Sequence, residues 1–201
     1  MKRVIAAAVV AALAACGGGR KAKVGKALLA YADGVEQAPE GWPVVEVMPG
    51  NAAPFPDAAT HVLVAADRDV SFAEVWPLIE GARARGVELR FYVGDRRDRV
   101  KVMEMNPPPQ GESIRIVVTE DGKACVNLPG VEEAKCVMTK QHRVDRAYTR
   151  ELVREAFRAS NLRQVRVQAD TGLRWNDVVR AVDGARTCCE GERMIVGLEN
   201  Y

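Results

Sequence analysis

The sequence predicts an α+β fold built from two related halves, each a mixed β-sheet with helices on one face. The first observation is the stretch Val165–Asn200, which reads as a strand, an acidic turn, an amphipathic helix and a second strand. The second is an earlier copy, Val62–Gly94, which matches it without a gap at an offset of 103 positions. The third is the order of elements, with several strands before helix-strand-helix-strand. A repeated supersecondary unit indicates a core assembled from duplicated halves.

Identical residues at equivalent positions define the repeat. One aromatic residue also stands opposite another, because Phe72 aligns with Trp175. The identical pairs are Val62/Val165, Val64/Val167, Ala66/Ala169, Asp67/Asp170, Val75/Val178, Gly81/Gly184, Ala82/Ala185, Arg83/Arg186 and Gly94/Gly197.

Asp67 and Asp170 follow the first strand of each copy, and two interpretations of them are open. In a dimer-like site they would form an equivalent acidic pair with separated pKa values, available to a partner. Alternatively, each carboxylate accepts hydrogen bonds from backbone N–H groups of the turn before its helix. The turn interpretation is favoured, because a turn that shapes the fold is what duplication preserves most simply.

The N-terminus has the layout of a signal peptide. Lys2 and Arg3 precede a twelve-residue apolar run, which is too short for a spanning helix of roughly 20 residues. The tetrapeptide before the first glycines, Leu13–Cys16, resembles a bacterial lipobox, which implies cleavage before Cys16 and lipidation of that cysteine. An ordinary signal peptide is the alternative. Residues 1–15 are then the signal, and residues 16–23 are the lipidated cysteine and a flexible tether.

Export would place the mature chain in the cell envelope, on the periplasmic side. Gly17 stands where enteric lipoproteins retained at the inner membrane carry Asp, so this resemblance favours the outer membrane. The chain has 29 Lys and Arg against 27 Asp and Glu, and loss of Lys2 and Arg3 would leave it formally neutral. A neutral chain argues against nucleic acid or anionic lipid as the main partner.

In the first half, residues 23–37 are predicted to form a short helix that ends near Gly34. The apolar run Val44–Met48 lies between prolines, which are excluded from strand interiors but common at strand ends. It is therefore predicted to be a strand between loops.

The first copy of the repeat is predicted to begin with a strand over His61–Ala66. A helix should follow from the N-cap Ser71 to Gly86, and Pro77 should kink it or limit its first turn. Two further strands are predicted, over 87–93 and 100–105.

The second half should open with a hairpin, because Asp121-Gly122 is the strongest short hairpin signal in the chain. A second turn at Pro129-Gly130 should lead to another strand, and a helix from about Asp145 to Ser160 precedes the second copy of the repeat. The predicted strands of this region are 114–119, 124–128 and 135–139.

Five segments of the second half occur in a recognisable order: IRIVVTEDGKACVN, YTRELVREAFRAS, VRVQAD, WNDVVRAVDGAR and RMIVGL. In this order they resemble the periplasmic domain of the ExbD/TolR family, and the first copy resembles only the C-terminal unit of that family. The resemblance divides the chain into a diverged first half (24–104), a linker (105–111) and an ExbD/TolR-like domain (112–201). It implies dimerisation, as an internal pseudo-dimer or as a homodimer.

The resemblance implies a periplasmic role without proton conduction. Family members carry a transmembrane helix with a proton-carrying Asp, whereas a cleavable signal without an acidic residue stands here. Contact with peptidoglycan or with a protein of an energy-transducing transport complex carries over. We therefore expect a non-enzymatic envelope lipoprotein that needs no cofactor.

Four further cysteines, Cys125, Cys136, Cys188 and Cys189, belong to the mature chain. In an oxidising compartment an even number of cysteines indicates disulfides, here with three connectivities. The Cys125–Cys136 bond is favoured, because the two residues flank a predicted turn on adjacent strands. A bond between Cys188 and Cys189 would strain the peptide between them, so these two are expected to be free or paired elsewhere.

The alternative function is a periplasmic thiol-redox protein that uses Cys188 and Cys189. Their position at a helix C-terminus disfavours it, because the helix dipole there destabilises a thiolate. A small-ligand binding module is a third possibility, although no polar constellation names a ligand. No nucleophile elbow, phosphate loop or zinc-peptidase motif occurs, and His61 and His142 lie outside any metal-ligand pattern, so no metal site is expected.

Overall fold

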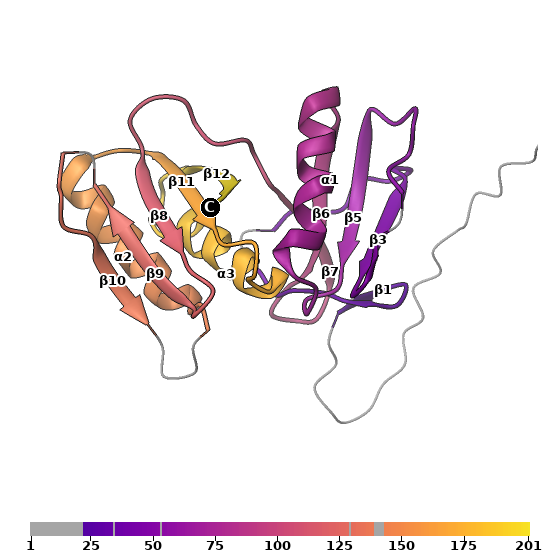
Figure 1. Ribbon diagram of the computed structural model, residues 1–201, viewed down its shortest axis with the longest axis horizontal. Coiled ribbons are helices and arrows are strands. Elements are labelled where there is room, and N and C mark those ends of the chain that lie inside the picture. The colour runs from indigo at the N-terminus through magenta and orange to yellow at the C-terminus, as the bar shows by residue number, and fades with distance from the viewer. Residues whose placement is uncertain (1–21, 34, 53, 129, 139–142) are drawn as a thin grey trace, which may run out of the picture.

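The computed structural model describes residues 22–33, 35–52, 54–128, 130–138 and 143–201. Within them the chain is a mixed α+β structure with two five-stranded sheets, a two-stranded hairpin and three helices (Figure 1). The predicted signal peptide, Cys16, Pro129 and His142 lie outside the described residues. No helix in the described part of the chain is both long enough and apolar enough to cross a bilayer.

The strands of the first sheet are β3 (Val44–Met48), β4 (Asn51–Ala52), β5 (His61–Ala66), β6 (Glu88–Gly94) and β7 (Val100–Glu104). They lie in the order β4-β3-β5-β6-β7, with β3, β5 and β6 parallel and the two edge strands antiparallel to their neighbours. Helix α1 (Phe72–Arg85) connects β5 to β6 as a crossover between parallel neighbours.

The strands of the second sheet are β8 (Ile114–Val118), β9 (Lys123–Asn127), β10 (Lys135–Met138), β11 (Gln164–Ala169) and β12 (Ile195–Asn200). They lie in the order β10-β9-β8-β11-β12, with β8, β11 and β12 parallel. Helix α2 (Arg146–Ser160) precedes β11, and helix α3 (Trp175–Arg186) connects β11 to β12. Each sheet therefore contains a parallel trio whose second and third strands flank a helix of the repeat.

The strands and helices predicted from residue 44 onward are confirmed, with small differences at their ends, whereas β4 was not predicted. Helix α1 continues through Pro77 to Arg85 and ends at Gly86, whose φ of 65° is left-handed. Helix α2 begins at Asp145, whose carboxylate accepts hydrogen bonds from two backbone N–H groups of the first turn. These local signals sufficed because neighbouring residues satisfy the backbone groups at the C-terminal end of α1 and at the N-terminal end of α2.

The predicted helix over residues 23–37 is wrong. The structure forms a hairpin of β1 (Lys23–Val24) and β2 (Ala27–Leu28), with Gly25 at a left-handed φ of 55°. The chain then extends along the end of β6, where the N–H of Ala32 donates to the carbonyl of Gly94 at 3.0 Å. The backbone of this segment forms hydrogen bonds to distant segments in place of the intrahelical hydrogen bonds that a helix would form. Tertiary contacts here override helix propensity.

Both faces of β5 are buried, and the N-terminal segment helps to cover the face that lies opposite α1. Val62 and Val64 belong to the same core as α1, while Leu63 and Ala65 point to the opposite face and are also buried. Strand β2 contacts β3 and β5 from the N-terminal segment. The segment therefore closes part of the first sheet that α1 leaves open.

The second sheet is covered on one face by α2 and α3 (Figure 1). Along β8, Ile114, Ile116 and Val118 are buried, whereas Arg115 between them is exposed. Buried residues of both sheets belong to one contiguous hydrophobic core.

Gly184 and Gly81 are equivalent in the repeat but have different surroundings. A Cβ on Gly184 of α3 would lie 2.8 Å from the carbonyl oxygen of Arg146 and 3.0 Å from Cβ of Thr149, both on α2. A Cβ on Gly81 of α1 would meet nothing closer than a guanidinium nitrogen of Arg85 at 3.9 Å. Only the second copy therefore requires glycine for helix packing.

We predict that Gly184→Ala lowers the free energy of unfolding by about 1–3 kcal/mol, because the added methyl group overlaps α2. The matched change Gly81→Ala should raise it by up to about 1 kcal/mol, because alanine favours the helix. Chemical denaturation under non-reducing conditions measures both. Similar effects of the two substitutions would contradict this account of the packing.

Candidate functional site

The N-termini of α1 and α3 meet at the junction of the two sheets. The side chains of the N-cap residues Ser71 and Arg174 do not accept the N–H groups of Phe72 and Trp175, although Glu74 belongs to a capping box and accepts the N–H of Ser71 at 2.9 Å. The N–H of Phe72 instead donates to the carbonyl of Leu173 at 2.7 Å, and the N–H of Trp175 donates to the carbonyl of Val70 at 2.8 Å. Each helix is thus capped by the turn that precedes the other helix.

A second pair of hydrogen bonds repeats this exchange. The N–H of Ala73 donates to the carbonyl of Thr171 at 2.9 Å, and the N–H of Asn176 donates to the carbonyl of Arg68 at 3.0 Å. Donors and acceptors of both pairs are related by the same offset of 103 positions that defines the repeat. Ser71 and Arg174 form an antiparallel bridge between them.

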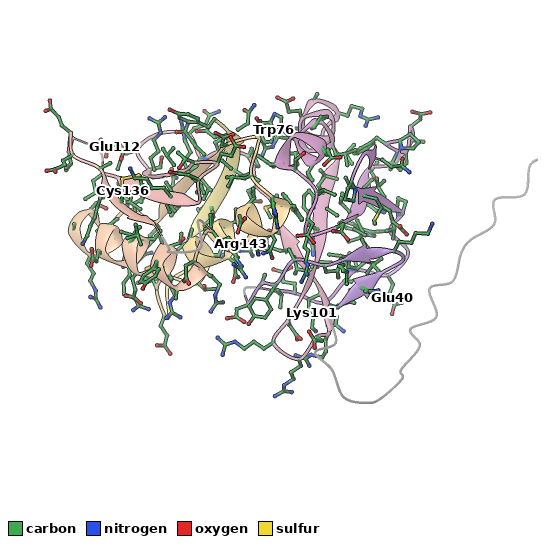
Figure 2. All side chains as sticks on the ribbon, turned by 60° about the horizontal axis from the view of Figure 1, so that its bottom comes forward. Glu40, Trp76, Lys101, Glu112, Cys136 and Arg143 are labelled. Atoms are coloured by element: carbon green, nitrogen blue, oxygen red, sulfur yellow. A yellow bond between two sulfur atoms is a disulfide. The ribbon has the colours of Figure 1, made fainter. Side chains whose placement is uncertain are left out.

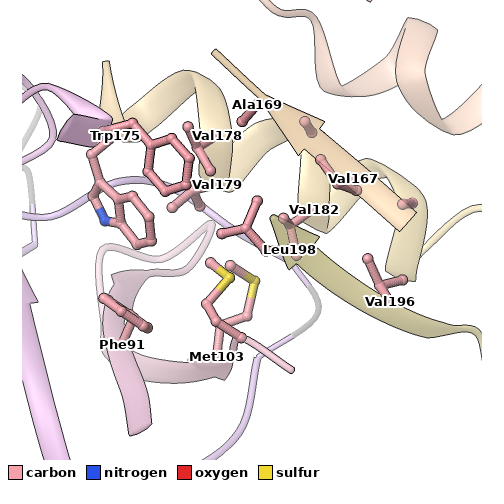
Figure 3. Packing of buried hydrophobic residues seen from close by; sticks show 14 of the residues in the cluster. Phe91, Met103, Val167, Ala169, Trp175, Val178, Val179, Val182, Val196 and Leu198 are labelled. Carbon is pink, nitrogen blue, oxygen red and sulfur yellow. The ribbon is translucent and has the colours of Figure 1, made fainter. Parts of the chain in front are cut away.

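Aromatic side chains fill the space behind these hydrogen bonds. Trp175 is fully buried, and its ring centroid lies 4.7 Å from that of Phe91 on β6 and 6.4 Å from that of Phe72 on α1. Figure 3 shows Trp175 of the second copy beside Phe91, with Met103 and Leu198 nearby. The helix of one copy therefore packs into the sheet of the other.

The two arginines at equivalent positions of the repeat, Arg83 and Arg186, form hydrogen bonds with backbone carbonyls at the end of β7 and just after it. Arg83 donates through Nη2 to the carbonyls of Asn106 at 2.9 Å and Leu198 at 2.8 Å. Arg186 donates through Nη1 to the carbonyl of Glu104 at 3.2 Å. The predicted linker is thus partly fixed, and the N–H of Leu198 also donates to the carbonyl of Asn106 at 3.0 Å.

An ion-pair network holds the N-terminal segment against the second half. Asp183 of α3 is fully buried, and its Oδ2 accepts hydrogen bonds from the N–H of Asp33 and from Nη1 of Arg146, both at 3.0 Å. Arg146 also pairs with the carboxylate of Asp33. The guanidinium of Arg96 binds that carboxylate through two hydrogen bonds of 2.8 and 2.9 Å.

The pKa of Asp33 is governed by these neighbours. Burial alone would raise it, but hydrogen bonds from Arg96, Tyr31 and Arg146 outweigh burial and lower the pKa to about 2. Burial and the hydrogen bond to Asp33 raise the pKa of Tyr31. The carboxylate of Asp33 therefore stays ionised throughout the neutral range.

Asp67 and Asp170 lie in equivalent turns. The carboxylate of Asp67 accepts a hydrogen bond from the N–H of Asp69 at 3.0 Å, and that of Asp170 accepts one from the N–H of Gly172 at 2.9 Å. In each case the donor lies two residues after the acid. Asp67 also accepts the N–H of Leu28 at 2.9 Å, which joins the N-terminal hairpin to the first copy.

The structure joins Cys125 to Cys136, which face each other on β9 and β10. Figure 2 shows Cys136 on the side of the second sheet that lies away from the first sheet. The bond crosslinks the two strands of the hairpin within their paired region, which is the pairing that the predicted turn favoured.

Cys188 and Cys189 are joined to each other, in contrast to the expectation of free or separately paired thiols. Cys188 is fully buried in the core, and its carbonyl accepts a hydrogen bond from Nε of Arg154 on α2 at 3.0 Å. The pair lies directly after α3, where the chain turns back toward β12.

Some of these residues could be identified from the sequence and others could not. Arg83 and Arg186 were visible as identical positions of the repeat. Asp33, Arg146 and Asp183 were not, because they are far apart in the chain and belong to no motif. Within the described ranges, no cluster of three or more His, Cys, Asp and Glu side chains is arranged to hold a metal ion.

Comparisons with models of known protein families, with curated proteins and with solved structures give no match.

We predict that Asp33→Asn lowers the free energy of unfolding by about 2 kcal/mol at neutral pH, because a carboxylate with a depressed pKa stabilises the fold when ionised. This contribution is present above the unfolded-state pKa near 3.8 and is lost as the pH falls toward about 2. Denaturation of both proteins between pH 2 and 7 measures the difference.

The control is Asp57→Asn, which changes an exposed loop carboxylate and should leave stability unchanged. A deficit in Asp33→Asn that does not shrink below about pH 4 would contradict the role given to this ion pair.

Proposed function

We propose that the protein is a non-enzymatic binding module of the cell envelope, an ExbD/TolR-like unit whose two related halves form a pseudo-dimer in one chain. The observation that carries the proposal is the reciprocal capping of α1 and α3 at positions 103 residues apart. Such an exchange is what a local twofold relation between two copies of one unit generates. Dimerisation is also what the sequence resemblance implies.

The order of elements in the second half supports the same proposal. A hairpin, a helix, a strand, a helix and a strand follow one another in the order of the family resemblance. The first half keeps the strand-helix-strand unit and its sheet but has no helix in the place of α2 among the described residues. We therefore describe the first half as a diverged partial copy.

The proposed location follows from the sequence of the N-terminus. A lipid on Cys16 would anchor the protein on the periplasmic side of the outer membrane, at a distance from the bilayer set by the short tether. The described chain begins at Ala22, whose Cβ lies beside Gly94 at the end of β6. The binding partner would be peptidoglycan or a protein of an energy-transducing transport complex.

A thiol-redox function is the second candidate, and the bond between Cys188 and Cys189 is the observation in its favour. Against it stand the complete burial of Cys188 and the position of the pair after the C-terminus of α3. A helix C-terminus destabilises the thiolate that exchange requires. If the pair resists reduction by thiols at periplasmic redox potentials, this candidate is excluded.

We expect purified mature protein to cosediment with isolated peptidoglycan sacculi, or to crosslink to an envelope protein in cells. Replacing residues 1–16 by a signal peptide that is cleaved without lipidation should move the protein from the membrane to the soluble periplasmic fraction while its binding to sacculi in vitro is unchanged. Absence of both cosedimentation and a crosslinked partner would overturn the proposal.

A further inference from the structure

The described chain begins at the end of the first sheet where β6 runs into β7. The carbonyl of Ala22 accepts the N–H of Leu29 at 2.9 Å, and a Cβ on Gly94, the last residue of β6, would lie 2.8 Å from Cβ of Ala22. Figure 1 shows β1 and the connection from β6 to β7 at this same end of the molecule. The predicted tether therefore joins the domain beside this connection.

Basic side chains at this end point outward. They lie on the β1–β2 hairpin and on the turn after β6, and together they define the tether face: Lys23, Lys26, Arg96, Arg97 and Arg99, all of which are exposed. The carboxylate of Asp95 in the same turn is buried, and it accepts the N–H of Arg97 at 2.8 Å and the N–H of Arg99 at 2.9 Å. The negative charge of the turn thus lies beneath its positive charges.

Two arginines of the tether face form ion pairs and still reach solvent. Arg99 pairs with Asp95 at 2.6 Å, and its side chain is 58% exposed. Arg96 pairs with Asp33 at 2.8 Å, and its side chain is 70% exposed. Because Asp33 and Asp95 are the less exposed members of these pairs, the guanidinium groups face outward.

Three cations of the tether face form no ion pair within the described ranges: Lys23, Lys26 and Arg97. Two acids beside them also form none there, namely Glu46, whose carboxylate lies over Gly25 of the hairpin, and Asp98 of the turn. The sequence adds Arg20 and Lys21 directly before the described chain. The whole chain is nearly neutral, so positive charge is concentrated where the tether meets the domain.

The predicted lipid on Cys16 would bring the tether face to the bilayer. Only residues 17–21 separate Cys16 from Ala22. A flexible segment of this length spans about 13 Å on average and about 20 Å when fully extended. The face can therefore reach the layer, about 8 Å deep at physiological ionic strength, in which the charge of an anionic leaflet acts.

We propose that the tether face docks on a bilayer surface that carries anionic phospholipid and thereby orients the domain. Its guanidinium and ammonium groups donate hydrogen bonds to headgroup phosphates, and each unpaired cation raises partitioning to such a surface roughly fivefold. The opposite end of the first sheet, where β5 and β6 begin, then faces away from the membrane. This inference goes beyond the binding function proposed above and rests on that proposal only for the lipid on Cys16.

The test uses the purified mature chain without its lipid. It should cosediment with vesicles of phosphatidylethanolamine and about 30% phosphatidylglycerol at about 50 mM salt, and should be released at about 0.5 M salt. Binding to vesicles of phosphatidylcholine should be at least about tenfold weaker, because that surface has no net charge.

Charge reversal locates the binding surface. The double variant Lys23→Glu with Arg97→Glu should bind the anionic vesicles at least about tenfold more weakly, because two unpaired cations become acids. The matched control is Arg158→Glu with Arg193→Glu, which changes the net charge equally at two exposed residues of the second half that form no ion pair in the described part of the chain. It should bind within about twofold of the unmodified protein.

All four changed side chains are exposed, so both variants should fold, which circular dichroism and thermal unfolding check. Equal binding to the two kinds of vesicle, no binding to anionic vesicles at about 1 mM lipid, or equal weakening by the two double variants would overturn the inference. So would a tether-face variant that loses binding to sacculi and keeps binding to vesicles, since the face would then belong to peptidoglycan. Because these vesicles hold no sacculi or envelope protein and the chain carries no lipid, failure here leaves the proposed function to its own test.

Discussion

The exchange of helix caps between the two copies is the constraint on which the rest of the structure depends. The first N–H groups of any α-helix have no partner within the helix, and they cost free energy if buried without one. Here the N–H groups of Phe72 and Trp175 find carbonyl acceptors only in the turn of the other copy. The two helices consequently need each other, and the two sheets cannot separate without exposing both caps.

Packing at the junction follows from that exchange. Once the helix N-termini are held side by side, Trp175 lies against Phe91 of the opposite sheet and Phe72 lies beside it. The repeated arginines then bind the chain that leaves β7, and the Asp33 network fixes the N-terminal segment to α2 and α3. Hydrogen bonds, aromatic packing and ion pairs thus join the two copies and the N-terminal segment at both ends of α1 and α3.

Sequence reasoning succeeded where local signals and local structure agree. The C-terminal end of α1 at Gly86, the N-terminal end of α2 at Asp145 and the Asp121-Gly122 turn were predictable, because neighbouring residues satisfy the backbone there. It failed for residues 23–37, where Gly25 adopts a left-handed conformation and distant strands supply the hydrogen bonds. Arg174 is a poor N-cap by propensity, and its position makes sense only when the acceptor from the other copy is known.

Native-state hydrogen exchange of the junction amides tests this account most directly. The account predicts that the N–H groups of Phe72, Ala73, Trp175 and Asn176 exchange with one common free energy, close to that of global unfolding, because both caps must open together. If the two amides of α1 exchange at a clearly lower free energy than those of α3, the copies open independently. That result would contradict the claim that reciprocal capping makes the two halves one folding unit.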